Sequence, residues 1–249
     1  MKLIGNTIFI TGGTSGIGRS LAEALHKRGN QVIISGRRKG HLAEVTKANP
    51  GMQSLELNVE DPASIAAVAK KLIAEYPKLN VLINNAGIMQ IDDAAGAIDD
   101  SVLVSIVTTN LLGPIRLTAA LLPLLRKQAH STVINVSSGL AFVPLASTAV
   151  YSATKAAIHS YTQSMRYRLK GSSVRVLELI PPWVQTDLLN SKDEPRAMPL
   201  AAFIEEAVTV LGTDAEEVMV ERVKMLRNNP GPNEFVFVAQ FNDMIASAH

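Results

Sequence analysis

The sequence has 249 residues, of which 47% are hydrophobic and 18% charged, and its formal net charge is +2. This size and composition suffice for one α/β core and give no indication of disorder. The 24 lysines and arginines are spread along the chain without a run of five, which argues against nucleic acid as the main partner. The absence of cysteine excludes disulfides, thiol catalysis and thiolate metal sites.

The start of the chain and its apolar stretches give no sign of membrane targeting. Met1 and Lys2 lead directly into a short apolar segment and a glycine-rich turn, without the apolar run or cleavage site of a signal peptide. The apolar stretches are interrupted well short of the ~20 residues that a membrane span needs. We therefore expect a cytoplasmic protein that does not associate with a membrane.

Short, β-branched and mostly continuous apolar segments recur up to residue 180, as expected for parallel strands buried on both faces. They are Thr7–Thr11, Gln31–Ser35, Ser54–Val59, Val81–Asn85, Thr132–Ser137 and Val174–Ile180. Amphipathic segments that predict helices alternate with them, among them Gly18–Arg28, Pro62–Tyr76 and Ser101–Lys127. This alternation predicts an α/β fold with a doubly wound parallel sheet of the Rossmann type, in a single domain over residues 1–249.

Two segments stand apart from this pattern. Residues 187–199 are polar, contain two prolines and follow the sixth predicted strand, so we interpret them as a mobile loop and candidate substrate lid. After Leu211 the pattern weakens, and Asn228–Asn233 predicts a turn before a short apolar tail.

A glycine-rich turn, TGGTSGIG over residues 11–18, joins the first predicted strand to the first helix. Its spacing, G-x-x-x-G-x-G, matches the dinucleotide fingerprint G-x-G-x-x-G only in part. Glycines permit positive φ and let the backbone approach a pyrophosphate, which then binds to free amides at the helix N-terminus. A tight turn with glycines needed only for packing is the alternative, but the position between strand and helix favours nucleotide binding.

The second predicted strand ends in Ser35-Gly36-Arg37-Arg38, without the carboxylate that usually binds the ribose hydroxyls of NAD. The two guanidinium groups would instead attract a 2′-phosphate. A charged hydrogen bond of about 1.5–3 kcal/mol would favour NADP(H) over NAD(H) by about 10- to 150-fold. The alternative is that both arginines are only solvated charges in a loop. Of the two interpretations, we predict a preference for NADP(H).

Tyr151 and Lys155 lie four residues apart on a predicted helix and therefore share one face of it. A phenol has an ordinary pKa of about 10, and a neighbouring ammonium favours the phenolate and lowers that pKa. Such a tyrosine transfers a proton at a carbon–oxygen bond while a dinucleotide takes or gives the hydride. The pair therefore predicts an oxidoreductase.

Polar residues follow the ends of two further predicted strands, at the edge where open α/β sheets bind ligands. Asn84-Asn85-Ala86-Gly87 ends the fourth strand, where the amides can tie strands together and the small residues leave room for a ribose. Ser137 and Ser138 end the fifth strand, and a hydroxyl there can donate to a substrate oxygen. Asn110, in the long helical segment, can hold a water near the lysine by exposing a backbone carbonyl in a distorted turn. Each has a structural alternative, but their order along the chain argues against coincidence.

The histidines and paired carboxylates give weaker signals. The five histidines show no metal spacing, so we predict no metal site, and we expect His159 to pack about two helical turns after Tyr151. Asp92-Asp93 and Asp99-Asp100 are more typical of helix caps than of hydrolytic acids.

With these motifs in order, the chain resembles a short-chain dehydrogenase/reductase over about residues 5–190. The resemblance rests on TGGTSGIG (11–18), NNAG (84–87), Asn110, NVSS (135–138) and YSATK (151–155). It implies a catalytic tetrad of Asn110, Ser138, Tyr151 and Lys155, with Tyr151 as the acid or base. Lys155 would lower the pKa of Tyr151 and hold the nicotinamide ribose, Ser138 would polarise the carbonyl, and Asn110 would support a proton-relay water.

The same resemblance implies a set of cofactor contacts, in which Thr186 holds the nicotinamide carboxamide and Arg37 matches members that prefer NADP(H). The implied NADP(H)-binding residues are Gly12, Thr14, Ser15, Gly16, Ile17, Gly18, Arg37, Asn58, Val59, Asn85, Ala86, Gly87, Tyr151, Lys155, Pro181, Val184 and Thr186. The segments SGLAF, ATKAAIHS and IPPWVQTDL also resemble a subgroup called DltE-like, whose substrates are poorly defined.

Three positions depart from the family pattern. Pro182 replaces a glycine after Pro181, which removes an amide beside the nicotinamide. Asn58 replaces an aspartate near the adenine. The usual glycine-rich final strand is absent, with Phe235–Ile245 in its place, so we expect a dimer through Ser101–Lys127 and Tyr151–Leu169 rather than the familiar tetramer.

We therefore predict an NADP(H)-dependent carbonyl reductase or alcohol dehydrogenase that acts on a small molecule. The first alternative is a nucleotide-binding regulatory or partner-binding protein without useful turnover. Nucleotide-sugar epimerase or dehydratase chemistry is a weaker alternative, because only about 60 residues follow the sixth strand. We expect Arg196 to meet any acidic group of the substrate. The candidate pocket residues are apolar: Met89, Leu140, Phe142, Val143, Leu145, Trp183, Leu188 and Leu189.

Overall fold

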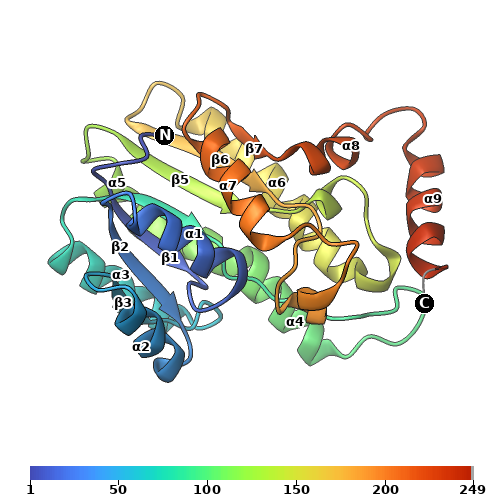
Figure 1. Cartoon of the computed structure of the whole chain (residues 1–249), viewed down its shortest axis with the longest axis horizontal. Coiled ribbons are helices and arrows are strands. Elements are labelled where there is room, and N and C mark those ends of the chain that lie inside the picture. The colour runs from blue at the N-terminus through green and yellow to red at the C-terminus, as the bar shows by residue number, and fades with distance from the viewer. Residues whose placement is uncertain (248–249) are drawn as a thin grey trace.

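A seven-stranded parallel sheet with helices on both faces forms the centre of the computed structural model, which describes residues 1–247 (Figure 1). The strand order is β3-β2-β1-β4-β5-β6-β7, so the chain reverses its direction of travel between β1 and β4. This confirms the predicted doubly wound fold and places its ligand edge at the carboxyl ends of these strands. The strands are β1 Thr7–Thr11, β2 Gln31–Gly36, β3 Gln53–Glu56, β4 Leu79–Asn84, β5 Ser131–Val136, β6 Val174–Ile180 and β7 Glu217–Met219.

The helices bury two apolar clusters, one on each face of the sheet. Successive side chains of β1 point to opposite faces of the sheet and so belong to different clusters. Ile8 and Ile10 belong to one cluster and Phe9 to the other, as the two-residue period of a strand requires. The first cluster includes side chains of α1, α2 and α7, and the second includes side chains of α3, α5 and α6. The helices are α1 Gly16–His26, α2 Lys39–Ala48, α3 Pro62–Glu75, α4 Asp100–Val107, α5 Gly113–Leu125, α6 Ala149–Arg168, α7 Leu200–Leu211, α8 Lys224–Arg227 and α9 Glu234–Ala246.

The predicted element boundaries hold best in the strands, and two differences have local causes. The third strand ends at Glu56 rather than Val59, because the Asn58 side chain accepts a hydrogen bond from the Glu60 amide at 3.2 Å and begins a turn. The long segment predicted over Ser101–Lys127 is divided by a π-helical turn at Thr108–Leu112.

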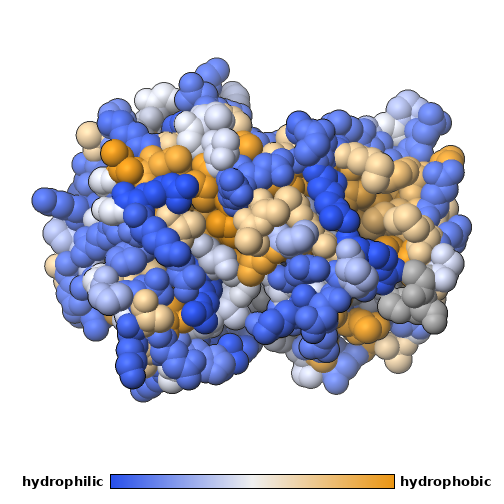
Figure 2. All heavy atoms as spheres, viewed as in Figure 1, coloured by the Kyte–Doolittle hydropathy of each residue, from blue (hydrophilic) through white to orange (hydrophobic). Residues whose placement is uncertain are grey.

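The C-terminal region corrects the expectation that the final strand is missing. Glu217–Met219 forms β7, which pairs in parallel with β6, although its three residues are too short to give a sequence pattern. Phe235–Ile245 lies in helix α9, none of whose described side chains is buried. Asn242 ties α9 to the loop before α6, where it donates to the Pro144 carbonyl at 3.0 Å and accepts from the Ala146 amide at 2.6 Å. Figure 2 shows apolar residues gathered on the side of the molecule where α8 and α9 lie. Met225 of α8 and Phe235 of α9 are exposed.

One helical run among the described residues, Asp100–Leu125, is long and apolar enough to cross a membrane by length and composition alone. The same test is passed by core helices of soluble proteins. This run spans α4, the π-helical turn and α5, and it packs against α3, α6 and strands β4 and β5. Of the apolar window in this run, 39% is buried inside the protein. The sequence analysis underestimated the length of this apolar run.

We predict that Gly18→Ala destabilises the fold by about 1–3 kcal/mol. A β-carbon at Gly18 would lie 2.3 Å from both the Asn85 side-chain nitrogen and the Gly12 carbonyl, so the turn and the β4 loop would have to separate. Urea unfolding monitored by circular dichroism measures this change. Gly40→Ala in α2 is the matched control, because nothing lies within 4 Å of its added β-carbon and we expect unchanged or slightly greater stability. Equal stability of the two variants would contradict the prediction.

Candidate active site

The first turn of α6, which carries Tyr151, is capped from the loop after β4. The two carboxylate oxygens of Asp92 accept hydrogen bonds from the amides of Ala149 and Val150, each at 2.9 Å. The sequence predicted that Asp92 is a cap but not which helix it caps, because the two segments are far apart in the chain. Asp99, also predicted as a cap, accepts from the Ser101 amide at 2.8 Å at the start of α4.

Tyr151 and Lys155 lie on the buried face of α6, with only 7% and 4% of their surfaces exposed. The Lys155 Nζ atom lies 5.4 Å from the centroid of the Tyr151 ring and donates to the Val136 carbonyl, at the end of β5, at 2.8 Å. A β-carbon built on Gly87 would lie 3.7 Å from Nζ and 3.3 Å from the Asn110 amide oxygen. The structure thus brings the tyrosine, the lysine, Asn110 and the NNAG segment together at the carboxyl edge of the sheet.

Burial dominates the acid–base properties of this pair. It raises the pKa of Tyr151 to about 12, and the smaller effect of a hydrogen bond with Ser138 acts in the opposite direction. Burial also lowers the pKa of Lys155 to about 8, while the charge of Glu178 raises it. In the protein alone the pKa of Tyr151 is therefore raised rather than lowered as expected, because the loss of solvation outweighs the hydrogen bond with Ser138.

Ser138 and Asn110 reach the site through irregular backbone. Ser138 begins a short 3-10 helix after β5, where its Oγ accepts from the Leu140 amide at 3.1 Å. Asn110 lies in the π-helical turn, which is the distorted turn that the sequence analysis expected. Its side chain accepts from the Ile88 amide and donates to the Ile88 carbonyl, both at 2.9 Å, and donates to Thr154 at 3.2 Å. The amide of Asn110 therefore joins the β4 loop to α6.

The glycine-rich turn forms a cradle beside this group. Gly12 and Gly16 have φ angles of 68° and 53°, in the left-handed region that favours glycine. A β-carbon on Gly12 would lie 2.9 Å from the Ala86 Cα atom, and one on Gly16 would lie 3.4 Å from Thr186. Ser15, the N-cap of α1, makes no side-chain capping hydrogen bond. The first amides of α1 are thus suited to an anionic group such as a pyrophosphate. The partly exposed residues of this cradle are Gly12, Thr14, Ser15, Gly16 and Ile17.

Asparagine amides tie the strands together, as the sequence predicted. Asn84 on β4 donates to the Asn135 side chain on β5 at 2.8 Å, and Asn135 donates to Thr162 on α6 at 2.9 Å. Asn85 donates to the carbonyls of Thr11 and Gly12 at 3.0 and 3.2 Å, which fixes the β4 loop against the glycine-rich turn.

Arg37 lies beside a cavity of about 440 Å³ at the end of β2. Its guanidinium contacts the Glu60 carboxylate at 3.5 Å, a long contact between side chains that are 63% and 27% exposed. The same Glu60 oxygen accepts from Thr109 at 2.9 Å, so Glu60 is held independently of Arg37. Val59 is buried, whereas Asn58 lines the cavity. The residues that line it are Arg37, Glu56, Asn58, Asp61 and Ser64.

The segment after β6 is more ordered than a simple loop. The Pro181 carbonyl accepts from the Gly139 amide at 2.9 Å, and Val184 is buried and forms a β-bridge with Met198. Residues 187–199 contain a kinked 3-10 helix, Leu188–Asp193.

Several expected pocket residues have other roles. Arg196 forms two hydrogen bonds with the Glu194 carboxylate, at 2.7 and 2.9 Å, and its guanidinium lies 5.1 Å from the centre of the Trp183 ring. An acidic group of a substrate would therefore have to compete with Glu194 for Arg196. Phe142 and Val143 are buried in the core rather than open to a pocket.

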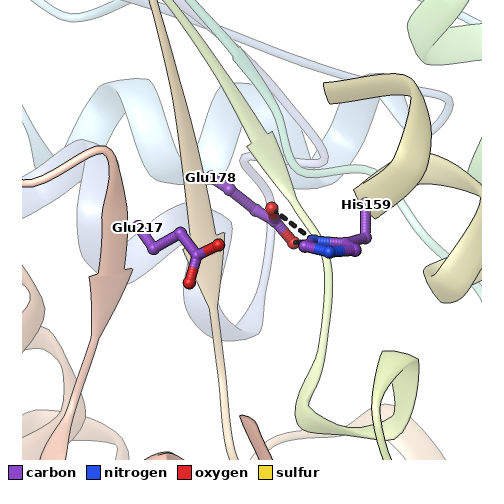
Figure 3. A group of neighbouring side chains, drawn as sticks. All are labelled: His159, Glu178 and Glu217. Atoms are coloured by element: carbon purple, nitrogen blue, oxygen red, sulfur yellow. Dashed lines mark hydrogen bonds and ion pairs between the residues drawn. The ribbon is translucent and has the colours of Figure 1, made fainter. Parts of the chain in front are cut away.

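Sequence reasoning missed a cluster of titratable groups next to the site. His159, Glu178 and Glu217 offer ligand atoms that all lie within 4.8 Å of one another (Figure 3). His159 was expected only to pack, and no sequence spacing links it to carboxylates on β6 and β7. The cluster forms only because these strands and α6 are neighbours in the fold.

Comparisons with known proteins identify the family. The family model for short chain dehydrogenases matches residues 6–197. The chain belongs to the short-chain dehydrogenase family. The uncharacterized oxidoreductase DltE of Bacillus subtilis is 39% identical over 234 residues, which cover 92% of this chain and 93% of that protein. The 3-oxoacyl-[acyl-carrier-protein] reductase FabG of Escherichia coli is 32% identical over 203 residues, 81% of this chain and 83% of its own length.

Solved structures agree with this assignment. A short chain dehydrogenase from Burkholderia cenocepacia in complex with NADP is 26% identical and has a TM-score of 0.85, with 96% of this chain and 98% of that chain covered. The resemblance to the family and to the DltE-like subgroup is thus confirmed, and the protein is an oxidoreductase of this family.

We predict that Asp92→Ala lowers the free energy of unfolding by about 1–2 kcal/mol, because two amides at the start of α6 lose their acceptor. Thermal and urea unfolding measure the loss. Asp93→Ala is the matched control, since the Asp93 side chain accepts only a local hydrogen bond from Ala95 at an exposed position. This variant should lose less stability. If the two variants lose equal stability, the cap on α6 does not have the role assigned to it.

Proposed function

We propose that the protein interconverts a carbonyl compound and a secondary alcohol with NADP(H), and that Tyr151 moves the proton. The observation that carries the proposal is the meeting of Ser138, Tyr151 and Lys155 at the carboxyl edge of the sheet, beside the glycine-rich cradle. When bound, the nicotinamide supplies the hydride in reduction and accepts it in oxidation.

With a pKa of about 12, the Tyr151 phenol holds its proton at neutral pH, so the proton that reduction needs is present on its hydroxyl. As hydride reaches the carbonyl carbon, the Tyr151 hydroxyl gives its proton to the substrate oxygen. The Ser138 hydroxyl donates a hydrogen bond to the same oxygen. The Lys155 ammonium stabilises the phenolate that is left, and a water held at the Asn110 carbonyl returns a proton from solvent.

The residues around this centre fit a dinucleotide. The N-terminus of α1 would hold the pyrophosphate, Lys155 the nicotinamide ribose and Thr186 the carboxamide. Ala86 and Gly87 leave space beside them, and Pro181 and Val184 form the opposite side after β6. Arg37 would bind the 2′-phosphate of NADP(H), and Asn58 would lie near the adenine.

Two further features support the choice of cofactor and substrate. The Arg37–Glu60 contact is long and exposed, so its loss costs less than about 1 kcal/mol and a phosphate competes readily for Arg37. Trp183, Leu188 and Leu189 are 38%, 38% and 37% exposed on the segment after β6, where they would contact an apolar substrate body. We also propose that residues 187–199 act as its lid.

Tyr151→Phe should lower kcat/KM for carbonyl reduction by about 10²–10⁴-fold, because the proton donor is lost while the ring still packs. A screen of aldehydes and ketones that follows NADPH absorbance provides the measurement, and NADPH fluorescence titration checks that cofactor binding is retained. Near wild-type turnover in this variant would reject the mechanism. Tight NADPH binding by the wild type with no turnover of any carbonyl or alcohol would favour a nucleotide-binding regulatory protein.

Arg37→Ala should weaken NADPH binding by about 10- to 150-fold and leave NADH binding unchanged, because only the contact with the 2′-phosphate is lost. Parallel fluorescence titrations with the two cofactors test this. Arg38→Ala removes an equal charge at the next residue and should cause a smaller loss of NADPH affinity. A parallel loss of NADPH and NADH affinity in Arg37→Ala would show that the arginine does not discriminate between them.

A further inference from the structure

Strand β6 carries a fully buried carboxylate that the proposed reaction does not use. The side chain of Glu178 is 0% exposed, and its two oxygens lie 3.0 and 2.8 Å from Nδ1 of His159 (Figure 3). His159 lies one helical turn after Lys155 on α6, so the two side chains share a face of the helix. The carboxylate is therefore held against the face of α6 that carries the catalytic lysine.

Strand register places Glu178 close to the carbonyl that binds Lys155. Glu178 is the partner of Asn135 on β5, and the next residue of β5, Val136, accepts the hydrogen bond from the Lys155 ammonium at 2.8 Å. The Lys155 ammonium is thus bound at the residue of β5 that follows the partner of Glu178, and Glu178 contacts the same helix through His159.

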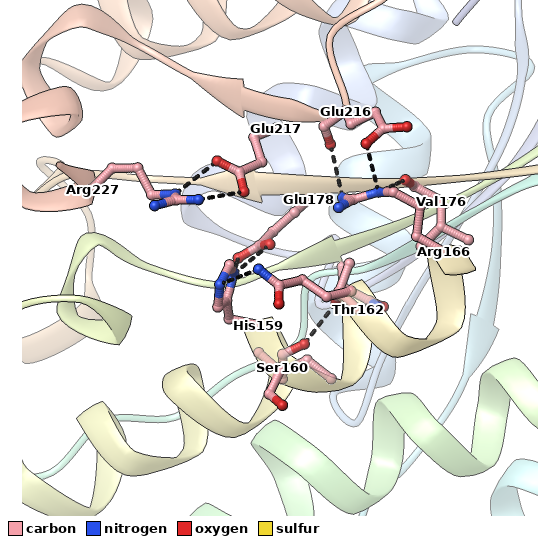
Figure 4. Close-up of polar contacts among 12 residues, drawn as sticks. His159, Ser160, Thr162, Arg166, Val176, Glu178, Glu216, Glu217 and Arg227 are labelled. Atoms are coloured by element: carbon pink, nitrogen blue, oxygen red, sulfur yellow. Dashed lines mark hydrogen bonds and ion pairs between the residues drawn. The ribbon is translucent and has the colours of Figure 1, made fainter. Parts of the chain in front are cut away.

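The other cations around this cluster are already paired (Figure 4). Arg227 on α8 donates to both oxygens of Glu217 on β7, at 2.8 and 3.0 Å. Arg166 on α6 donates to the Val176 carbonyl at 3.0 Å and lies 3.4 Å from the Glu216 carboxylate. Neither arginine forms an ion pair with Glu178 among residues 1–247.

His159 fixes the position of the Glu178 carboxylate. The Gln163 side-chain nitrogen lies 2.9 Å from Nε2 of His159. An amide nitrogen donates, so Nε2 accepts from Gln163 and Nδ1 carries the hydrogen that points to Glu178.

Within the described part of the chain, Lys155 forms no ion pair, and the two arginines around Glu178 pair with Glu216 and Glu217 instead. A buried cation and a buried anion that lie close together stabilise each other. We propose, on the basis of the function proposed above, that Glu178 is a positioning residue that keeps Lys155 in its ammonium form, with His159 fixing the carboxylate against α6. The charge of Glu178 also raises the pKa of Lys155 against the effect of burial.

A divalent metal ion is the competing interpretation of His159, Glu178 and Glu217. Arg227 occupies both oxygens of Glu217, and the Nδ1 hydrogen of His159 points at Glu178. A metal ion at this place would have to displace the arginine and the ring hydrogen. The experiment is therefore run in the presence of a chelator, so that a metal ion does not contribute.

The test follows the protonation of Lys155 directly by NMR of the free protein with isotope-labelled lysine, and Lys155→Arg assigns the signal. In wild type we expect a midpoint near 8, set by burial. Glu178→Gln keeps the size of the side chain and removes its charge, so it should lower the midpoint, with a proton affinity at least about threefold weaker. The alkaline limb of kcat/KM for carbonyl reduction should move to lower pH by the same amount.

Two matched variants separate this role from a purely structural one. Glu217→Gln removes a carboxylate that is already paired with Arg227 and should leave the Lys155 midpoint unchanged. Glu178→Asp keeps the charge and should return the midpoint most of the way to wild type. An unchanged midpoint in Glu178→Gln, or an equal shift in Glu217→Gln, would overturn the proposal. A third outcome is that the Lys155 midpoint shifts in Glu178→Gln while the wild-type protein reduces no carbonyl. This outcome would support the electrostatic role of Glu178 and reject the proposed function.

Discussion

The burial of one ammonium group is the constraint around which the ligand edge of this protein is organised. Lys155 is only 4% exposed, and burial lowers its pKa to about 8. A charge removed from water in this way must be stabilised by nearby groups. The Val136 carbonyl accepts one of its hydrogens, and the Tyr151 ring lies 5.4 Å away. The end of β5, the first turns of α6 and the loop at Gly87 all approach the ammonium nitrogen of Lys155. The geometry of the proposed chemistry therefore follows from the need to stabilise this buried charge.

A network of side-chain amides holds these approaching elements in place. Asn84 and Asn135 link β4, β5 and α6, and Asn110 links the β4 loop to α6. These amides are buried and, apart from the Asn84 Oδ1 atom, hydrogen-bonded to protein groups, so they stiffen the site. The proposed function assigns other groups to the ligands: the first amides of α1 and the hydroxyl of Ser138. The site therefore combines a rigid polar scaffold with a small number of groups that can face a dinucleotide and a carbonyl oxygen.

Residues near the C-terminus also contribute to the surroundings of α6. The family model matches residues 6–197, and the groups around α6 include residues after this segment. Glu217 on β7 and Arg227 on α8 pair with each other beside Glu178, and the Arg227 guanidinium lies 4.7 Å from the centre of the Phe142 ring. Phe142 in turn packs edge-on against His159. The charge environment of the helix that carries Tyr151 and Lys155 is thus shared between the segment matched by the family model and the residues that follow it.

The sequence by itself determined the fold class, the six longer strands, the glycine-rich turn and the pair of Tyr151 and Lys155, because local period and spacing encode them. Asn110 and Ser138 were identified through the order of the motifs and the resemblance to a known family. Only the tertiary structure decided features that depend on residues distant in the chain. It revealed β7, since three residues become a strand only by pairing with β6, and it joined Asp92 to α6. It also reversed the expected pKa shift of Tyr151 and placed Glu178 and Glu217 beside His159. Desolvation and charge pairing depend on what surrounds a side chain, and a linear sequence does not record those surroundings.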